Sequence, residues 1–256
     1  MLAPVRAHAE PLRALGDWPD AGVLQDLISA RNVTNATGAR LRLVEPAGEP
    51  YEARIYLRGE LQVRGRNWHD LFNVLAWLAY PLTKRELNRR HYLAWQKEHT
   101  EGPSPRRGRV RDALTLFDES GAIVAASDPA LLDDVRNFRW KRLFWERRER
   151  LRESARVFVF GHALFEKALD PYVGMTAHSL LIALDRDRLT GPRVVDDLDA
   201  LVSELIRNSR DLDEPRALAP LPVLGVPGWW LDTEREEFYD DIAYFRPGRA
   251  KRTRAQ

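Results

Sequence analysis

Two neighbouring segments carry polar side chains that could do acid–base or ligand chemistry on helices that are otherwise apolar. Residues 67–79 read NWHDLFNVLAWLA, and His69 and Asn73 stand among leucine, valine, phenylalanine and alanine. At about 100° per residue, His69 and Asn73 share one arc of a predicted helix. A helix that is apolar nearly all round is buried, so its polar residues must face partners or a cavity.

The second segment follows a break at Tyr80-Pro81 and repeats the pattern. Lys84, Asn88 and His91 are spaced four and three residues apart, which places them on one helical face. Imidazole can accept a proton or bind a metal, and an ammonium group can bind an anion. Because the joint is short, we expect the two helices to pack together. The pattern predicts a polar cleft with His69, Asn73 and His91 as catalytic candidates and Lys84 and Asn88 as ligand-binding candidates.

Helix capping offers another explanation for several neighbouring polar residues. Asn67 is a favoured N-cap, with Asp70 three residues later. Thr83 and Glu86 fit a capping box, in which the threonine caps and the glutamate reaches back. His69 and Asn73 could also be a satisfied buried pair. The order His69, Asn88, His91 is that of small His-metal nucleases, but those need a hairpin where this sequence predicts helix.

Three further candidates come from later segments. Arg111 and Asp112 open a predicted strand over 112–117, where neither residue is needed for a turn. Asp112 is therefore a catalytic candidate and Arg111 a ligand-binding one. His162 follows Gly161 where a predicted strand passes into a helix, a place that often presents side chains to clefts. Asp118-Glu119-Ser120-Gly121 could hold a magnesium ion, but it is interpreted as a β-turn.

Hydrophobic periodicity predicts an α+β fold with an antiparallel sheet and packed helices, because strands and helices do not alternate regularly. A helix is expected to begin at Asp17-Trp18-Pro19, and Ser127-Asp128-Pro129 is a second helix start. The predicted strands are 40–44, 51–57, 61–63, 112–117, 122–126, 156–160 and 178–184, and the later helices are 140–152, 163–169 and 194–208.

The chain is expected to form one globular domain over residues 1–248, followed by a basic, disordered tail over 249–256. Residues 99–110, rich in Gly, Pro and Arg, are expected to be a loop with local disorder. From Pro215 onward the sequence is rich in proline and large apolar residues, which predicts an extended strap packed over the body.

Composition excludes several classes of protein. There are 40 basic and 38 acidic residues among 256, so the net charge of +2 does not favour a polyanion partner. There is no cysteine, which excludes disulfides, thiolate metal sites and cysteine nucleophiles. No apolar run reaches the roughly 20 residues of a membrane span. We expect a cytoplasmic protein that makes no membrane contact. Walker A, GxGxxG, GxSxG, HExxH and EF-hand motifs are absent.

Four segments resemble the blocks of an uncharacterised bacterial family, domain of unknown function 3025. They are NWHDLFNVLAWLAYPLTKRELNRRH, RDALTLFDESG, FGHALFEKALDPYVGMTAH and PLPVLGVPGWW with FYDDIAYFRP, in order over about residues 51–246. The resemblance implies a single bacterial domain and carries no activity or catalytic residue with it.

Two functions follow as hypotheses. The first is an enzyme with a polar cleft, such as a metal-dependent hydrolase or nuclease, whose metal, cofactor and substrate the sequence leaves unassigned. The second is a non-catalytic module that binds nucleic acid or protein through the arginine-rich segment 140–152 and the basic tail. For nucleic-acid binding, Arg142, Arg147, Arg148 and Arg150 would have to form one exposed basic face.

Overall fold

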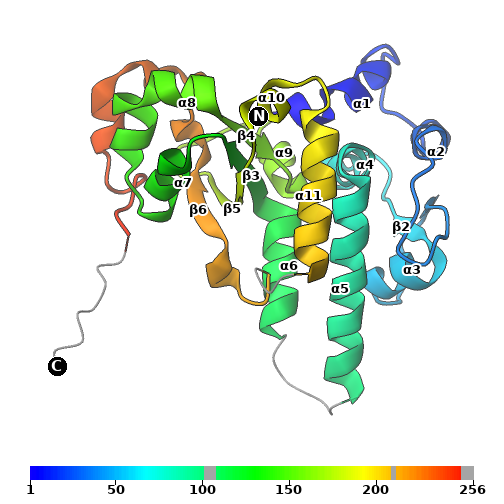
Figure 1. Cartoon of the computed structure of the whole chain (residues 1–256). Helices are drawn as coiled ribbons and strands as arrows, with labels where there is room; N and C mark the ends of the chain where they lie inside the picture. The colour runs from blue at the N-terminus through cyan, green and yellow to red at the C-terminus, as the bar shows by residue number, and fades with distance from the viewer. Residues whose placement is uncertain (101–107, 209–211, 249–256) are drawn as a thin grey trace.

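Helices dominate the chain, and its strands form two separate sheets. The computed structural model describes residues 1–100, 108–208 and 212–248 (Figure 1). Its α-helices are α1 (Ala3–Arg13), α2 (Ala21–Ala30), α3 (Tyr51–Arg58), α4 (Trp68–Ala79), α5 (Pro81–Thr100), α6 (Arg109–Ser120), α7 (Pro129–Arg136), α8 (Arg148–Ser154), α9 (His162–Lys167), α10 (Arg186–Thr190) and α11 (Val194–Asn208). Its strands are β1 (Arg42–Val44), β2 (Glu60–Gln62), β3 (Gly121–Ala126), β4 (Ala155–Val159), β5 (Thr176–Ala183) and β6 (Ala219–Pro222).

The larger sheet has the strand order β4-β3-β5-β6. The outer pairs are antiparallel, whereas the central strands β3 and β5 are parallel, with Gly121 opposite His178. The α+β class is therefore confirmed, but the sheet is mixed rather than purely antiparallel. The small sheet pairs β1 with β2 in parallel. Every residue of β3 is buried, which identifies it as the centre of the core.

Helices α5, α6 and α11 run side by side below the sheet (Figure 1). Helix α4 is buried along nearly its whole length, as its apolar composition predicts. It begins where Asn67 Oδ1 accepts a hydrogen bond from the Asp70 amide at 2.9 Å, so the predicted N-cap is correct. Pro81 starts α5 directly after Tyr80, and the phenol of Tyr80 donates to the carbonyl of Val159.

The predicted capping box of α5 is wrong, because the cap comes from another helix. Asp199 of α11 accepts hydrogen bonds from the backbone amides of Leu82 and Thr83 at 2.9 and 2.7 Å. The Thr83 hydroxyl donates to the Asp199 carbonyl rather than capping its own helix. Glu86 forms ion pairs with Arg89 and Arg207 instead of reaching back.

The predicted strand 51–57 is helix α3. Tyr51 and Ile55 lie four residues apart and both face inward, a spacing that fits a helix as well as a strand over so short a segment. The helix ends at Gly59, whose φ of 68° is left-handed, as is common after a helix. Residues 40–63 therefore hold a parallel pair of strands and a helix instead of the three predicted strands.

The predicted strand 112–117 is helix α6, so the hairpin predicted around residues 118–121 does not form. The buried side chains of Ala113, Leu114 and Phe117 follow helical spacing. Helix α6 runs straight into β3 at Gly121. A side chain at Gly121 would lie 2.2 Å from the carbonyl oxygen of Phe117, so glycine permits this abrupt change of direction.

Most of the remaining predictions are confirmed, but the helix predicted to begin at Asp17 begins at Ala21, with Asp20 as its N-cap. Strands appear at or within two residues of 122–126, 156–160 and 178–184, and α11 spans 194–208 as predicted. Asp128 caps α7, and a helix follows Gly161. The segment 140–152 is helical but contains a π-helical turn over Arg142–Glu146 before α8.

The segment after Pro215 packs over the body as an extended strap. After β6 it continues through short 3-10 turns at Val223–Gly225, Leu231–Glu234 and Glu236–Asp240. The phenol of Tyr244 accepts from the Leu224 amide and donates to the Met175 carbonyl, which ties the strap to the chain preceding β5.

Some predictions concern residues outside the described ranges. The tail 249–256 lies outside them, as do residues 101–107 of the predicted loop. The flanks of that loop, His99–Thr100 and Arg109–Val110, belong to α5 and α6. No helix in residues 1–100, 108–208 or 212–248 combines the length and the apolar character needed to cross a membrane.

The Asp199 cap yields a stability prediction. Replacing Asp199 by Ala leaves the buried amides of Leu82 and Thr83 without their acceptor, so the free energy of unfolding should fall by about 1–3 kcal/mol. Urea denaturation followed by circular dichroism measures the change. Glu204→Ala, at an exposed position on the same helix, should change it by less than about 0.5 kcal/mol. Equal stability of Asp199→Ala and the wild type would contradict the interhelical cap.

Candidate functional site

A cleft of about 600 Å³ opens between helices α3, α4, α5, α6 and the start of α9. It is the place where most of the sequence-predicted side chains come together. Those lining it are His69, Asn73, Lys84, Asn88, His91, Arg111 and His162. Asp112 is exposed and is not among the lining residues. The expectation that Asp112 joins the cleft rested on a strand, and on the observed helix its side chain leaves the axis about 100° away from that of Arg111.

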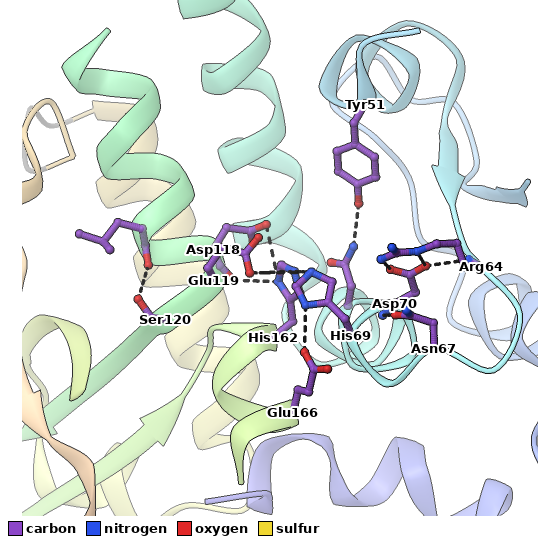
Figure 2. Close-up of polar contacts among 12 residues, drawn as sticks. Tyr51, Arg64, Asn67, His69, Asp70, Asp118, Glu119, Ser120, His162 and Glu166 are labelled. Atoms are coloured by element: carbon purple, nitrogen blue, oxygen red, sulfur yellow. Dashed lines mark hydrogen bonds and ion pairs between the residues drawn. The ribbon is translucent and has the colours of Figure 1, made fainter. Parts of the chain in front are cut away.

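Three side chains from three helices converge at one end of the cleft (Figure 2). His69 comes from α4, Glu119 from α6 and His162 from α9. The two imidazole Nε2 atoms lie 3.0 Å apart. One carboxylate oxygen of Glu119 lies 3.8 Å from Nε2 of His69 and 3.5 Å from Nε2 of His162. Among the described residues, these three side chains form the group that could hold a metal ion.

The opposite edge of each imidazole is fixed by a hydrogen-bond acceptor. His162 Nδ1 lies 2.8 Å from the carbonyl oxygen of Asp118, and His69 Nδ1 lies 3.1 Å from a carboxylate oxygen of Glu166. A carbonyl and a carboxylate accept hydrogen bonds, so both Nδ1 atoms carry the hydrogen. This tautomer leaves the Nε2 lone pairs directed at one another and at Glu119. Metal-binding histidines are held in this way.

Backbone contact between the end of α6 and Gly161, the residue before α9, sets the spacing of Glu119 and His162. A side chain at Gly161 would lie 2.4 Å from the Glu119 carbonyl oxygen and 2.4 Å from the Gly121 nitrogen. Only glycine permits this approach. The amides of Phe160 and Gly161 both donate to the Gly121 carbonyl, at 3.0 and 2.9 Å. The end of α6 and the start of α9 are thereby locked together.

Burial and the neighbouring charges keep His162 neutral. Burial lowers the pKa of His162 to about 3, with Lys84 and His69 adding to the effect. His162 is thus a neutral imidazole, the form that binds metals. Burial and the neighbouring carboxylate of Asp118 raise the pKa of Glu119.

A buried cation stands next to the cluster. The ammonium of Lys84, whose side chain is 3% exposed, donates to Asp118 at 2.6 Å and to Asn73 Oδ1 at 2.8 Å. Burial alone would raise the pKa of Asp118, but the charge and hydrogen bond of Lys84 outweigh burial and hold it below its usual value. Asn73 in turn donates to the Tyr51 hydroxyl at 2.7 Å. This network joins α3, α4, α5 and α6.

The other end of the cleft is polar but lies apart from the three-residue cluster. His91 Nε2 lies 3.3 Å from the Thr115 hydroxyl. Asn88 donates to the carbonyl and the carboxylate of Glu52, and Arg111 forms an ion pair with Glu98 at 2.9 Å. His91 is therefore not placed with the other two cleft histidines.

The carboxylates around the two cluster histidines were not predicted as site residues. Asp118 and Glu119 were interpreted as part of a β-turn, and Glu166 was not connected with His69. The available signal was the helical spacing of Leu114 and Asp118, four residues apart, which places Asp118 on the buried face of α6. The His162 to Glu166 spacing was visible too, but Glu166 reaches His69 from another helix.

The arginine-rich segment does not present the free basic face that nucleic-acid binding would need. Arg142 and Arg147 form ion pairs with Asp134 at 3.7 and 2.8 Å. Arg148 pairs with Glu234, and Arg150 pairs with Asp128. Each of the four side chains therefore has a carboxylate within ion-pair distance, and Asp134 is shared by Arg142, Arg147 and Arg139.

Comparison with known proteins identifies a family and carries no activity with it. No curated protein matches the chain, and no solved structure matches it. The model of a family described as "Protein of unknown function (DUF3025)" matches residues 41–249, a range that includes α3 to α11 and every residue of the cleft. The chain therefore belongs to the DUF3025 family, as its sequence motifs indicated.

Proposed function

We propose that this protein is a metal-dependent hydrolase whose single divalent cation is held by His69, Glu119 and His162. The observation that carries the proposal is the convergence of two Nε2 lone pairs and one carboxylate oxygen. A hydrogen bond from Nδ1 holds each imidazole in place. Without a cation or a proton between them, two lone pairs at 3.0 Å would repel.

The dimensions of the cluster suit zinc. The three ligand atoms form a triangle with sides of 3.0, 3.5 and 3.8 Å. A point equidistant from the three atoms lies about 2.0 Å from each, which is the length of zinc bonds to imidazole nitrogen and carboxylate oxygen. The cluster needs little rearrangement to accept the ion.

The number of protein ligands favours catalysis over a structural role. Structural zinc sites use four protein ligands, whereas catalytic sites use three and leave a position for water. His69, Glu119 and His162 are the three such ligands found among the described residues, and they line a cleft large enough for a small molecule. A bound cation lowers the pKa of water and so supplies a nucleophile at neutral pH.

Neighbouring groups suit an acyl-transfer reaction with water. In hydrolysis the water oxygen bonds to the acyl carbon, the bond to the leaving group breaks, and the water proton passes to the leaving group. Negative charge develops on the acyl oxygen. The buried ammonium of Lys84 lies in the same cleft, and we assign it to stabilising that charge.

The first test is the binding of the metal. Chelator-treated protein should bind one zinc ion per chain in isothermal titration calorimetry, and His69→Ala or Glu119→Gln should weaken binding by about 100-fold or more, because each variant removes a ligand. His99→Ala is the matched control, since His99 is exposed at the end of α5. If a proton rather than a metal joins the imidazoles, zinc affinity will be the same in His69→Ala and the wild type.

The second test concerns Glu166, whose carboxylate accepts the Nδ1 hydrogen of His69. Glu166→Gln keeps the shape of the side chain but weakens the acceptor of the His69 Nδ1 hydrogen. Zinc affinity should fall by about 10–100-fold. The free energy of unfolding should stay within about 0.5 kcal/mol, because Glu166 is partly exposed. Unchanged zinc affinity would remove Glu166 from the site. Glu153→Gln, on α8, serves as control.

The third test is hydrolysis itself. Zinc-loaded protein should hydrolyse at least one chromogenic probe among p-nitrophenyl acetate, acetyl-p-nitroanilide and bis(p-nitrophenyl) phosphate. Chelation should abolish the reaction, zinc should restore it, and Glu119→Gln should lower kcat/KM by about 100-fold or more. Activity that survives chelation, or a zinc-loaded protein inert to all three probes, would contradict the proposal.

A further inference from the structure

The charged groups lining the cleft are already compensated, which limits what can bind there. Its cations are Arg64, Lys84 and Arg111. They pair with Asp70 at 2.8 Å, Asp118 at 2.6 Å and Glu98 at 2.9 Å, respectively. A phosphate or a polyanion would have to break one of these pairs. An uncharged ligand leaves all of them intact.

Four polar atoms of residues that line the cleft are buried and have no hydrogen-bond partner within the described part of the chain. Burying such an atom is unfavourable unless a hydrogen-bond partner satisfies it. Trp77 and Asn88 are only 1% and 4% exposed and both line the cleft, so a group held in the cleft is the partner that could reach them. The four atoms are Gln62 Nε2, Trp77 Nε1, Asn88 Oδ1 and Arg111 Nε.

The chemistry of these atoms is asymmetric. Those of Gln62, Trp77 and Arg111 are N–H donors, whereas Asn88 Oδ1 is an acceptor. The orientation of the Asn88 amide follows from its nitrogen, which donates to the carbonyl and the carboxylate of Glu52 at 3.0 and 2.6 Å. The complementary ligand therefore offers oxygen acceptors and at least one hydrogen to donate.

We infer that the cleft binds a small, uncharged carboxylic amide. The carbonyl oxygen of an amide accepts from an N–H donor of Trp77 or Arg111, and its N–H donates to Asn88 Oδ1. An ester or a carboxylate of the same shape has no hydrogen to donate to Asn88 Oδ1.

This inference rests on the proposed hydrolytic function and names its substrate class. Hydrolysis of an amide adds the water oxygen to the carbonyl carbon and breaks the C–N bond. The proton of the water passes to the departing amine nitrogen. Water is the sole co-reactant, so the reaction balances without an oxidant or a reductant.

Three probes of matched shape test the inference. Benzamide, methyl benzoate and benzoate differ in the group that meets the cleft. Calorimetric titration of the chelator-treated wild type, in which no zinc ion attracts benzoate, should show benzamide binding at least fivefold more tightly than either of the others. Asn88→Leu should remove that preference, whereas Asn208→Leu, at an exposed position on α11, should keep it.

Two controls separate the possible failures. Zinc content and circular dichroism of every variant show whether the metal site and the fold are intact. If the wild type binds zinc but binds the three probes equally, or binds benzoate best, the amide inference is overturned while the metal proposal stands. If the wild type fails to bind zinc, the proposed function fails, and the probe preference then tests the cleft alone. A preference for benzamide that Asn88→Leu retains also overturns the assignment.

Discussion

The contact between the backbones at Glu119, Gly121 and Gly161 is the constraint on which the candidate site depends. It joins the end of α6 to the start of α9 at a distance that no side chain at Gly161 would permit. The carbonyl of Asp118 then holds His162, and Glu119 lies directly beside it. The central strand β3 leaves from the same point, so the core of the sheet and the polar cluster share one anchor. Helix α4 completes the cluster by placing the imidazole of His69 next to that of His162.

The second organising interaction is a buried chain of polar contacts. Lys84 lies between Asn73 and Asp118, and Asn73 continues the chain to Tyr51. Breaking a buried ion pair at one partner costs several kcal/mol, so the helices that carry these residues are held in one arrangement. The same interactions keep the site preorganised, because few of its side chains are free to turn.

The residues that line the cleft were predicted from the sequence more accurately than the helices that carry them. His69, Asn73, Lys84, Asn88 and His91 could be found because polar residues interrupt apolar helices at regular spacing. Asp118 and Glu119 were considered for a magnesium ion but assigned to a β-turn, because Asp-Glu-Ser-Gly has the composition of a turn. In the structure a helix runs into a strand at this point. The confirmed elements, such as α11 and β3, are those with long or wholly apolar patterns. The errors at α3 and α6 fall on short segments, where periods of two and of 3.6 residues are hard to separate.

The cap of α5 illustrates a different limit. Thr83 and Glu86 have the local spacing of a capping box, yet Asp199 supplies the acceptors from more than a hundred residues away. Local rules describe what a helix end needs, but they do not say which part of the chain provides it. A buried carboxylate that accepts two amide hydrogens satisfies that need more fully than a neighbouring hydroxyl.

The unequal exposure of the three cluster residues has a consequence for how the centre would be filled. His162 is 4% exposed, whereas the side chains of His69 and Glu119 are 32% and 39% exposed. An ion approaching from solvent would therefore meet the two accessible ligands first and the deep imidazole last, without any unfolding of the chain. Such a centre would be loaded after folding, and its occupancy would depend on the concentration of the ion around the folded protein.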